Sequence, residues 1–448
     1  MRYFPLTPDD RAEMLVALGL SSVEDLFADI PPAIRIRQPF SIPALSEPEV
    51  VERLENLAAK DLNTKSTPSF LGGGIYRHYV PAAIKHLLMR AEFYTAYTPY
   101  QAEVSQGTLQ AIFEYQTMIC LLTGMEVSNA SMYDGATATT EAALMARSIT
   151  GRKRVLVAGT LHPQYRATLR TYLHLQGLEL VEIPWDKQGR IDLSHAYGEE
   201  AACLIVQSPN FFGVVEEMAA AGQWIHAAGG IFVHAFAEAA SFGLLPPSAS
   251  FDADIACGEG QSLGMPPSYG GPGLGVFAAK EKYVRRMPGR LIGEALDADG
   301  QRAFTMVLAT REQHIRREKA TSNICSNQAL CALNALIYLS LLGEEGFRQV
   351  AEQCYHKAHY LAERLQTIAG LKPTFTAPFF NEVAFTLPGS PQALNAYLLK
   401  HGILGGIALG RDYPGLANSW LVAATEMNGK EQIDALVARV AQWRGGLA

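Results

Sequence analysis

The chain has 448 residues, of which 48% are hydrophobic and 18% charged, and its formal net charge is −7 at pH 7. This balance is typical of a folded protein with a large interior and excludes an intrinsically disordered chain. The small negative charge, with no long basic run, argues against a nucleic-acid partner.

Two segments bear on membrane association. The stretch "MRYFPLTPDDRAEML" at the N-terminus lacks the apolar core of a signal peptide. The most apolar later run, Ala329 to Gly343, contains Asn334 and is too short to span a bilayer. We therefore expect a cytoplasmic protein with no membrane partner.

Residues 1–60 are expected to form an N-terminal helical arm. Three signatures of a helix start lie in it, from Thr7 to Asp10, from Ser21 to Glu24 and from Ser46 to Glu49. Each is followed by an amphipathic run, as in helices whose first turn is capped by a side chain.

Residues 61–310 are expected to form a large α/β domain. Short β-branched runs alternate there with helical segments: "KRVLVAG", "LELVEIP", "ACLIVQSP", "GIFVHAF", "ADIACGEG" and "LGVFAAK". The alternation predicts a mostly parallel sheet with helices on both faces. Ligands bind such sheets at the carboxyl ends of the strands, where His162, Asn210, His234 and Gln261 stand in this sequence.

Residues 311–448 are expected to form a smaller C-terminal α+β domain. A long helical stretch from Arg311 leads into it, followed by the strand-like runs "NEVAFTL" and "WLVAAT".

Five segments resemble a known family. They are "GGGIYRHYVP", "TPYQAEVSQGTLQAIFEYQTMICLLTGMEVSNASMYDGATATTEAA", "LHPQYRATLRTY", "GEGQSLGMPPSYGGPGLG" and "RREKATSNICSNQAL". Over nearly the whole chain they resemble the glycine cleavage system P-protein, in particular the alpha subunit of its two-chain form. The resemblance implies the aspartate-aminotransferase-like fold, which is fold type I of the pyridoxal-phosphate (PLP) enzymes. It also implies decarboxylation of glycine on PLP and transfer of the aminomethyl group to the lipoyl arm of H-protein.

The resemblance also locates the residues that PLP chemistry requires, namely a lysine for the Schiff base and an acid for the pyridine nitrogen. In catalytic relatives the lysine precedes a "GGPG" segment by a fixed interval, and counting back from Gly270 reaches Gln261. An amide cannot form an imine. The acid is expected at the end of the preceding strand, where this chain has His234. Lys280 and Lys282 lie beyond the glycine-rich segment and are expected to be solvated.

These two differences predict that PLP is bound covalently by a lysine-bearing beta subunit rather than by this chain. Enzymes of this fold complete each active site with loops of the neighbouring chain. We therefore expect an alpha2beta2 heterotetramer that also meets glycine and lipoyl H-protein.

Thr321, Ser322 and Asn323 are the first candidates for such a cross-subunit contribution. In relatives the equivalent loop reaches the cofactor phosphate of the neighbouring site, and short hydroxyl and amide side chains suit that role. The alternative is an ordinary helix N-cap, and the two roles are compatible.

A second group of candidates for the substrate pocket lies in "YTAYTPYQAEVSQG" and comprises Tyr97, Tyr100, Gln101 and Glu103. Aromatic rings with a polar tip exclude water beside a small zwitterion and still offer hydrogen bonds. The alternative is ordinary packing of an interface loop.

A third group lies in "GGGIYRHYVP" and comprises Tyr76, Arg77 and His78. The glycines permit close backbone approach, and Arg77 suits a carboxylate. Ordinary packing is again the alternative.

Two further features recur in the resembling family. The turn Gly135 to Thr137 precedes a helix expected to start near Thr139, and it binds the cofactor phosphate in catalytic relatives. Here we expect it to cap the helix. His162 stands where relatives stack a histidine on the pyridine ring, and without the lysine we expect a structural role.

Two other functions remain open at this point. One alternative to an enzyme subunit is a degenerate scaffold of the same fold, with a binding or regulatory role. The other is an independent PLP enzyme that uses another lysine. We expect no metal site. Cys354, His356 and His359 lie close in sequence, but only two share a helical face and no further ligand is suitably spaced.

Overall fold

The computed structural model describes residues 5–36, 38, 41–195, 198–320 and 322–443. The chain divides into two compact units, Met1–Asn63 and Thr64–Ala448.

The first unit contains helices α1 (Pro8–Ala17) and α2 (Glu47–Ala58) with a short 3-10 helix, Val23–Phe27, between them. The capping boxes of Thr7 with Asp10 and of Ser46 with Glu49 are confirmed. The capping box expected from Ser21 to Glu24 lies one residue later, because Ser22 is the cap and Asp25 is its partner. None of the residues in these three helices is buried.

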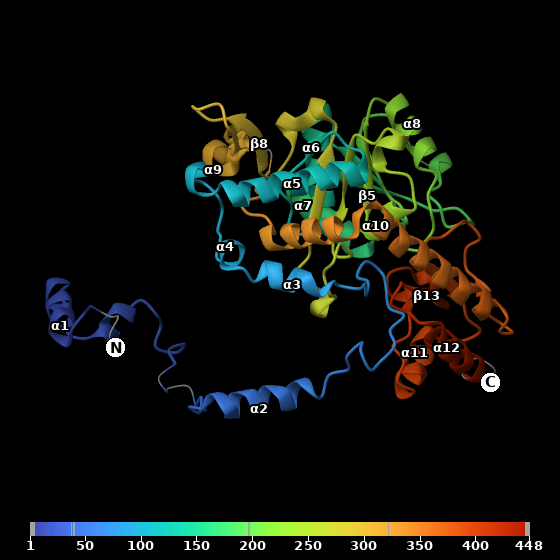
Figure 1. Ribbon diagram of the computed structural model, residues 1–448, viewed down its shortest axis with the longest axis horizontal. Helices are drawn as coiled ribbons and strands as arrows, with labels where there is room; N and C mark the ends of the chain where they lie inside the picture. The colour runs from blue at the N-terminus through green and yellow to red at the C-terminus, as the bar shows by residue number, and fades with distance from the viewer. Residues whose placement is uncertain (1–4, 37, 39–40, 196–197, 321, 444–448) are drawn as a thin grey trace. The chain divides into compact units, whose positions relative to one another are not determined.

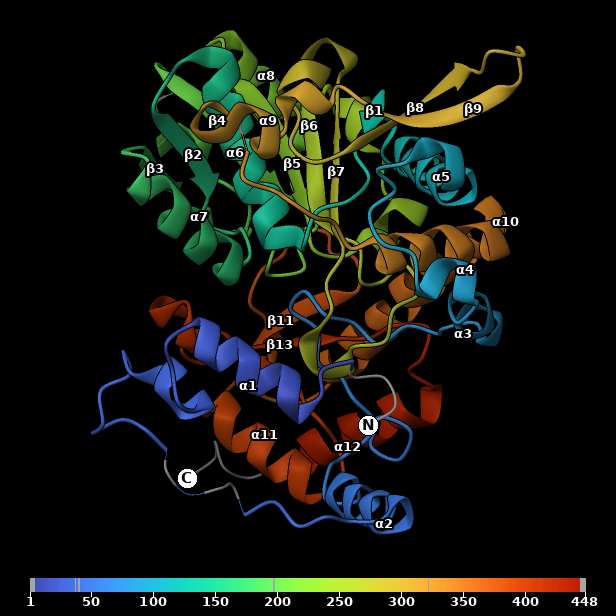
Figure 2. The same cartoon turned by 90° about the vertical axis from the view of Figure 1, so that its left-hand side faces the viewer.

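The second unit is built around a seven-stranded sheet in the order β1-β7-β6-β5-β4-β2-β3 (Figures 1 and 2). Its strands are β1 (Val127–Ser128), β2 (Arg154–Ala158), β3 (Glu179–Ile183), β4 (Ala201–Gln207), β5 (Ile231–Phe236), β6 (Ile255–Glu259) and β7 (Gly275–Ala279). Strands β3, β2, β4, β5 and β6 run parallel, whereas β7 is antiparallel to β6 and β1 to β7. The mostly parallel sheet expected from the alternating pattern is therefore present.

Helices cover both faces of this sheet. Apolar residues of α6 (Gly135–Thr150) and α7 (Pro163–Leu175) pack on one face. Residues of α8 (Met218–Ala227), α5 (Gln106–Thr123) and the first half of α10 pack on the other. Strands β4 and β5 have no exposed residue, as expected of parallel strands buried on both sides.

A smaller antiparallel sheet has the order β10-β11-β13-β12. It comprises β10 (Lys372–Pro373), β11 (Glu382–Thr386), β12 (Ile407–Ala408) and β13 (Ser419–Ala423), and it packs with α11 (Pro391–Lys400) and α12 (Lys430–Gln442). The remaining elements are α3 (Ala82–Leu88), α4 (Ala91–Tyr94), α9 (Gln313–Arg316) and the hairpin of β8 (Leu291–Leu296) with β9 (Arg302–Val307).

Helix α10 (Ala329–Gln366) runs between the two sheets and is bent at Gly343, whose φ is 60°. Its first half packs with the large sheet and its second half with the small one. It continues well beyond the apolar run seen in the sequence, so by length and composition alone it is long and apolar enough to cross a membrane. Because it packs in two core clusters, we describe it as a core helix.

The α/β class, with a large mostly parallel sheet and a smaller C-terminal sheet, agrees with the expectation. The proposed boundaries at residues 60 and 310 stay predictions. Phe70 lies in the core of the small sheet, and its N–H donates to the carbonyl of Leu404 at 2.9 Å. The segment after residue 63 therefore packs with the C-terminal sheet, a long-range pairing that no local pattern indicates.

Candidate functional site

A cavity of about 270 Å³ lies at the carboxyl ends of the parallel strands. Its walls are formed by Gly72–Ile75, Asp134, Ala136, His162–Tyr165, Phe211, Glu259, Gln261, Gly270–Gly273, Ile407 and Arg411. Since His162 follows β2, Phe211 follows β4 and Gln261 follows β6, this is the position expected for a ligand on such a sheet.

Gln261 lies in this wall, two residues beyond β6, and its side chain binds backbone groups. Its Oε1 accepts from the N–H of Tyr76 at 2.9 Å, and its Nε2 donates to the carbonyls of Tyr76 at 3.0 Å and Met265 at 2.6 Å. The amide thus holds the segment around Tyr76 against the end of β6.

Gln261→Ala is expected to lower the free energy of unfolding by about 3 kcal/mol, because it leaves buried N–H and carbonyl groups of Tyr76 and Met265 unpaired. Gln261→Lys leaves the Tyr76 N–H unpaired and is expected neither to restore stability nor to form a Schiff base. Calorimetry measures the first effect, and absorbance with added PLP the second. Gln110→Ala is the matched control, because Gln110 is exposed and bonds to Glu114. A wild-type melting temperature for Gln261→Ala would contradict this assignment.

The structure does not bring His234 to the cavity. Its Nδ1 meets the hydroxyl of Ser248 at 2.8 Å and its Nε2 meets the carbonyl of Ser208 at 3.2 Å. The ring packs among aromatic residues including Phe242 and Phe251, and burial lowers its pKa to about 4. His234 is a neutral core histidine, and it does not lie where the sequence analysis expected the acid that meets the pyridine nitrogen.

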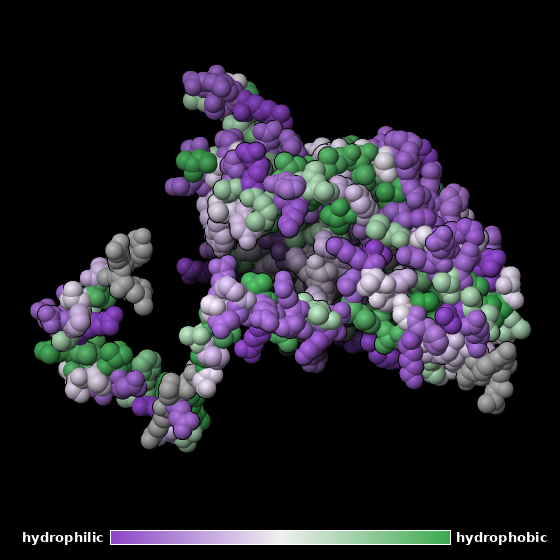
Figure 3. Space-filling model, turned by 60° about the horizontal axis from the view of Figure 1, so that its bottom comes forward, coloured by the Kyte–Doolittle hydropathy of each residue, from purple (hydrophilic) through white to green (hydrophobic). Residues whose placement is uncertain are grey.

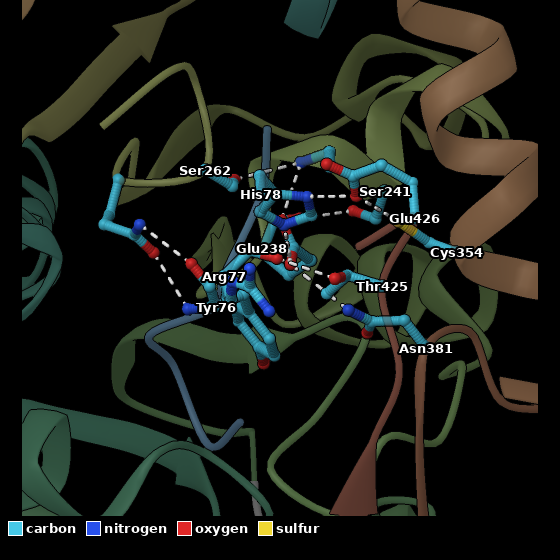
Figure 4. Close-up of polar contacts among 12 residues, drawn as sticks. Tyr76, Arg77, His78, Glu238, Ser241, Ser262, Cys354, Asn381, Thr425 and Glu426 are labelled. Carbon is cyan, nitrogen blue, oxygen red and sulfur yellow. Dashed lines mark hydrogen bonds and ion pairs between the residues drawn. The ribbon is translucent and has the colours of Figure 1, made fainter. Parts of the chain in front are cut away.

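The acidic side chain at this strand end is Glu238, two residues after β5, which the sequence analysis missed. Its Oε2 meets Nε2 of His78 at 3.1 Å and accepts from Asn381 Nδ2 at 3.2 Å (Figure 4). Nδ1 of His78 meets Oε2 of Glu426 at 2.8 Å, and the thiol of Cys354 donates to the same oxygen at 3.4 Å. These side chains come from five segments far apart in the sequence.

His78 is an imidazolium in this buried network. Burial alone lowers the pKa of His78, but the charge of Glu238 and hydrogen bonds that include both glutamates outweigh it and raise that pKa well above its ordinary value. His78, Cys354 and Glu426 bring their ligand atoms within 4.8 Å of one another. Since both ring nitrogens already face carboxylates, we interpret the group as an ion-pair cluster.

Tyr76 and Arg77 differ in their surroundings. The hydroxyl of Tyr76 donates to Glu382 at 2.8 Å, and burial raises the pKa of the Glu382 carboxyl to about 7. Arg77 is half-buried, and its carbonyl accepts from the Thr425 hydroxyl at 2.6 Å. Tyr76 and His78 therefore anchor their segment through buried polar contacts, whereas a substrate contact by Arg77 stays a prediction.

Helix α6 begins at Gly135, earlier than the sequence indicated, and carboxylates cap it. Asp134 accepts from the N–H of Thr137 at 2.8 Å, and Glu259 accepts from the N–H of Gly135 at 3.0 Å. The other oxygen of Glu259 accepts from the N–H of Leu274 at 2.7 Å. Burial raises the pKa of Glu259 to about 7.

His162 lies on the cavity wall and caps helix α7. Its Nδ1 accepts from the N–H of Gln164 at 3.1 Å, and its Nε2 meets the carbonyl of Gly73 at 2.8 Å. Burial lowers its pKa to about 4, so the ring is neutral. Gly74 approaches this ring so closely that an added Cβ would lie 2.8 Å from Nε2.

Lys280 and Lys282 lie beyond strand β7. Lys280 Nζ pairs with Asp252 at 2.7 Å and with Asp254 at 2.9 Å, and Lys282 Nζ lies 3.7 Å from Asp254. The expectation of solvated side chains is therefore correct for Lys282, which is 59% exposed, and wrong for Lys280, which is only 20% exposed. Neither residue lines the cavity.

A second cavity of about 270 Å³ lies beside the Tyr97–Pro99 segment, and Arg290 lines it. Arg290 donates to the hydroxyls of Thr98 at 3.1 Å and Tyr100 at 3.2 Å and to the carbonyl of Cys325 at 2.5 Å. Sequence reasoning missed Arg290, which connects two of the predicted segments.

The predicted pocket residues of this segment are mostly exposed. The exposed fractions are 81% for Tyr97 and 58% for Tyr100, and Glu103 is exposed while Gln101 is also at the surface. Their role in a substrate pocket stays a prediction.

Ser322 and Asn323 line a cleft of about 460 Å³, and Thr321 lies outside the described residues. Ser322 Oγ accepts from the N–H of Ile324 at 3.1 Å, a turn rather than a cap of α10, and Asn323 is exposed. The same cleft is lined by the cationic side chains of Arg147, Arg286, Arg316 and Lys319.

The first cavity does not fit covalently bound PLP, the cofactor that the fold implies. Among the described residues that line it there is no lysine, and Gln261 stands at the expected position. The N-terminus of α6, which suits a phosphate, is occupied by Asp134 and Glu259. No reaction step is therefore assigned to this cavity.

Comparison with known proteins gives concordant matches. The model of the glycine cleavage system P-protein family matches residues 1–440. A probable glycine dehydrogenase (decarboxylating) subunit 1 of Thermomicrobium roseum is 52% identical over 441 residues, which cover 98% of each chain. The protein of the same description from Moorella thermoacetica is 49% identical over 452 aligned residues, and the alignment covers 100% of each chain.

Solved structures agree with these matches. A crystal structure of glycine decarboxylase (P-protein) of the glycine cleavage system, in inhibitor-bound form, matches with a TM-score of 0.88 and 44% identity, over 99% of this chain and 100% of the other. Cysteine desulfurase of Thermococcus onnurineus matches with a TM-score of 0.61 and 18% identity, over 90% of this chain and 99% of the other. The second match bears on the fold alone.

Proposed function

Because this chain belongs to the glycine cleavage system P-protein family, we propose that it is the subunit of glycine decarboxylase that does not hold the cofactor covalently. A lysine-bearing partner subunit binds PLP as a Schiff base. The pair decarboxylates glycine and transfers the aminomethyl group to the lipoyl arm of H-protein. The observation that carries this proposal is Gln261, which takes the lysine position in a chain about half identical to relatives described as subunit 1.

When bound in the partner, PLP takes up the electrons that are freed as glycine loses carbon dioxide. This chain contributes the surrounding surface rather than the covalent bond. Its loops bind and orient groups of the partner's site and exclude water from it.

Exposed apolar side chains support an obligate partner. Leu87, Met89, Tyr94 and Tyr97 are each at least 40% exposed and lie on or directly after α3 and α4. Figure 3 brings forward the side of the second unit that carries these helices, and apolar groups interrupt the polar surface there. Exposed apolar side chains that lie near one another favour burial against a partner.

The two predicted contact segments are joined through one side chain. Arg290 binds Thr98 and Tyr100 on one segment and the carbonyl of Cys325, just after Asn323, on the other. We place Tyr97, Tyr100, Gln101 and Glu103 near the partner's substrate.

The loop of Thr321, Ser322 and Asn323 is placed near the partner's cofactor phosphate. The cleft beside Ser322 and Asn323 is lined by four cationic side chains against the two carboxyl groups of Glu141 and Glu318, and this excess of positive charge favours an anion there.

The proposed assembly is an alpha2beta2 heterotetramer that acts on glycine and on lipoyl H-protein. A cytoplasmic location is part of the same proposal. The rival function, a degenerate scaffold without catalytic role, is disfavoured because chains about half identical along their full length are described as enzyme subunits.

The test is glycine–bicarbonate exchange with purified subunits, measured for this chain alone, for the lysine-bearing subunit alone and for mixtures. Exchange is expected only in mixtures, and it should rise with added chain until the two are equimolar. Exchange by this chain alone would contradict the proposal.

Asn323→Ala is expected to weaken retention of PLP by the assembled enzyme about tenfold, because an amide that contacts the phosphate is lost. Since Asn323 is exposed, the folding of this chain should be unaffected. Equilibrium dialysis of the assembled enzyme measures the loss. Asn418→Ala, another exposed asparagine, is the matched control. Unchanged retention in Asn323→Ala would count against the cross-subunit role.

A further inference from the structure

The start of α6 is a natural anion site, and this chain fills it with its own carboxylates. A helix of 16 residues directs the N–H groups of its first turn and the positive end of its dipole toward the cavity, where Asp134 and Ala136 form part of the wall. A phosphorylated ligand entering the cavity would need these groups.

Glu259 occupies the site most completely. Its two oxygens accept from Gly135 N–H at 3.0 Å and from Leu274 N–H at 2.7 Å, which belong to the helix start and to the glycine-rich loop. The glycine-rich loop lies close to Oε2, since an added Cβ on Gly273 would be 3.1 Å from it. Asp134 accepts a hydrogen bond from the N–H of Thr137. An entering phosphate would have to displace one carboxylate and would lie beside the other.

We propose that Glu259 is a resident anion that excludes phosphorylated pyridoxal cofactors from this chain's cavity, so that the cofactor is bound only by the partner subunit. The exclusion acts in addition to the missing lysine, since it blocks noncovalent binding too. Only the final clause of the proposal rests on the proposed function.

The test is fluorescence titration of the full chain with pyridoxamine 5′-phosphate, which carries no aldehyde and so forms no imine with surface lysines. Pyridoxamine, which lacks the phosphate, is the matched ligand. Measurements at pH 8.5 keep Glu259 ionised. The wild-type chain is expected to show no preference for the phosphorylated ligand.

Glu259→Ala frees two N–H groups and is expected to bind pyridoxamine 5′-phosphate at least about tenfold more tightly than the wild type, with little gain for pyridoxamine. Glu259→Gln keeps the volume and one acceptor, so a gain of about threefold is expected. Glu216→Ala is the control, because Glu216 is also buried and also accepts from a backbone N–H, that of Ile191, but does not line the cavity. Circular dichroism establishes that each variant is folded.

The proposal is overturned by a wild-type chain that already prefers the phosphorylated ligand, or by folded Glu259 variants that gain no affinity. If Glu259→Ala does not fold, Glu259→Gln decides the question by the same criterion. Neither result alters partner-dependent exchange activity, so the proposed function is judged separately.

Discussion

His78→Ala is expected to lower the free energy of unfolding by about 3–5 kcal/mol, because it removes the cation between two buried carboxylates. Glu238 and Glu426 would then lie within the interior without their shared partner. The loss would also remove the two ion pairs of this segment, whereas the bond of Tyr76 to Glu382 on β11 would remain. Urea denaturation monitored by circular dichroism measures the change.

His174→Ala is the matched control, since His174 is exposed near the end of α7 and should change stability by less than about 0.5 kcal/mol. A loss below about 1 kcal/mol in His78→Ala would show that His78 is not the buried imidazolium described here.

The same cluster predicts how stability depends on pH. The pKa of His78 is raised in the folded chain, so its contribution is fully present below the pKa of an unfolded histidine, about 6.5. This contribution to stability is lost as the pH rises through the pKa that His78 has in the folded chain. The stability difference between the wild type and His78→Gln should therefore shrink steadily as the pH is raised from 6 to 9. A difference that grows over this range would reverse the assigned sign.

Arg290→Gln is expected to lower kcat/KM for glycine in the mixed subunits by about 100-fold. Arg290 holds the Tyr97–Tyr100 segment and the backbone at Cys325 in one arrangement, and errors of about 1 Å in such loops cost rates of this order. Arg290→Lys should recover little, because an ammonium does not reproduce the planar set of donors. Steady-state exchange kinetics with the partner subunit measure the loss.

Arg302→Gln provides the control, because Arg302 forms an exposed pair with Glu294 on the β8–β9 hairpin. Tyr100→Phe removes one of the three bonds and should cost less than Arg290→Gln. Activity of Arg290→Gln within threefold of the wild type, in a folded and assembled enzyme, would rule out the positioning role.

The strand segments and the ligand-bearing edge of the sheet were predictable because they depend on local signals. The β-branched runs mark β2 to β7, and counting from the glycine-rich loop placed Gln261 at the cavity. Thr7 and Ser46 were recognised as caps because each partner lies three residues away.

Contacts between distant segments were not predictable from such signals. His78 meets Glu238 across 160 positions and Glu426 across 348, and no spacing rule connects them. One signal was overlooked, since Glu238 is an acid within the apolar run "VHAFAEAA" and buried acids need a partner. His234 was expected at the strand end, but β5 continues to Phe236, so His234 lies within the strand and its ring packs against Phe242 and Phe251 on one face of the sheet.

The most direct test of the central claim is borohydride reduction of PLP added to this chain alone, to the partner alone and to the mixture, followed by peptide mapping. The account predicts stable pyridoxyl label on one lysine of the partner, a Schiff-base absorbance band that appears with that subunit, and no site-specific label on this chain. Stoichiometric label on a lysine of this chain would contradict the account and would make it a PLP enzyme in its own right.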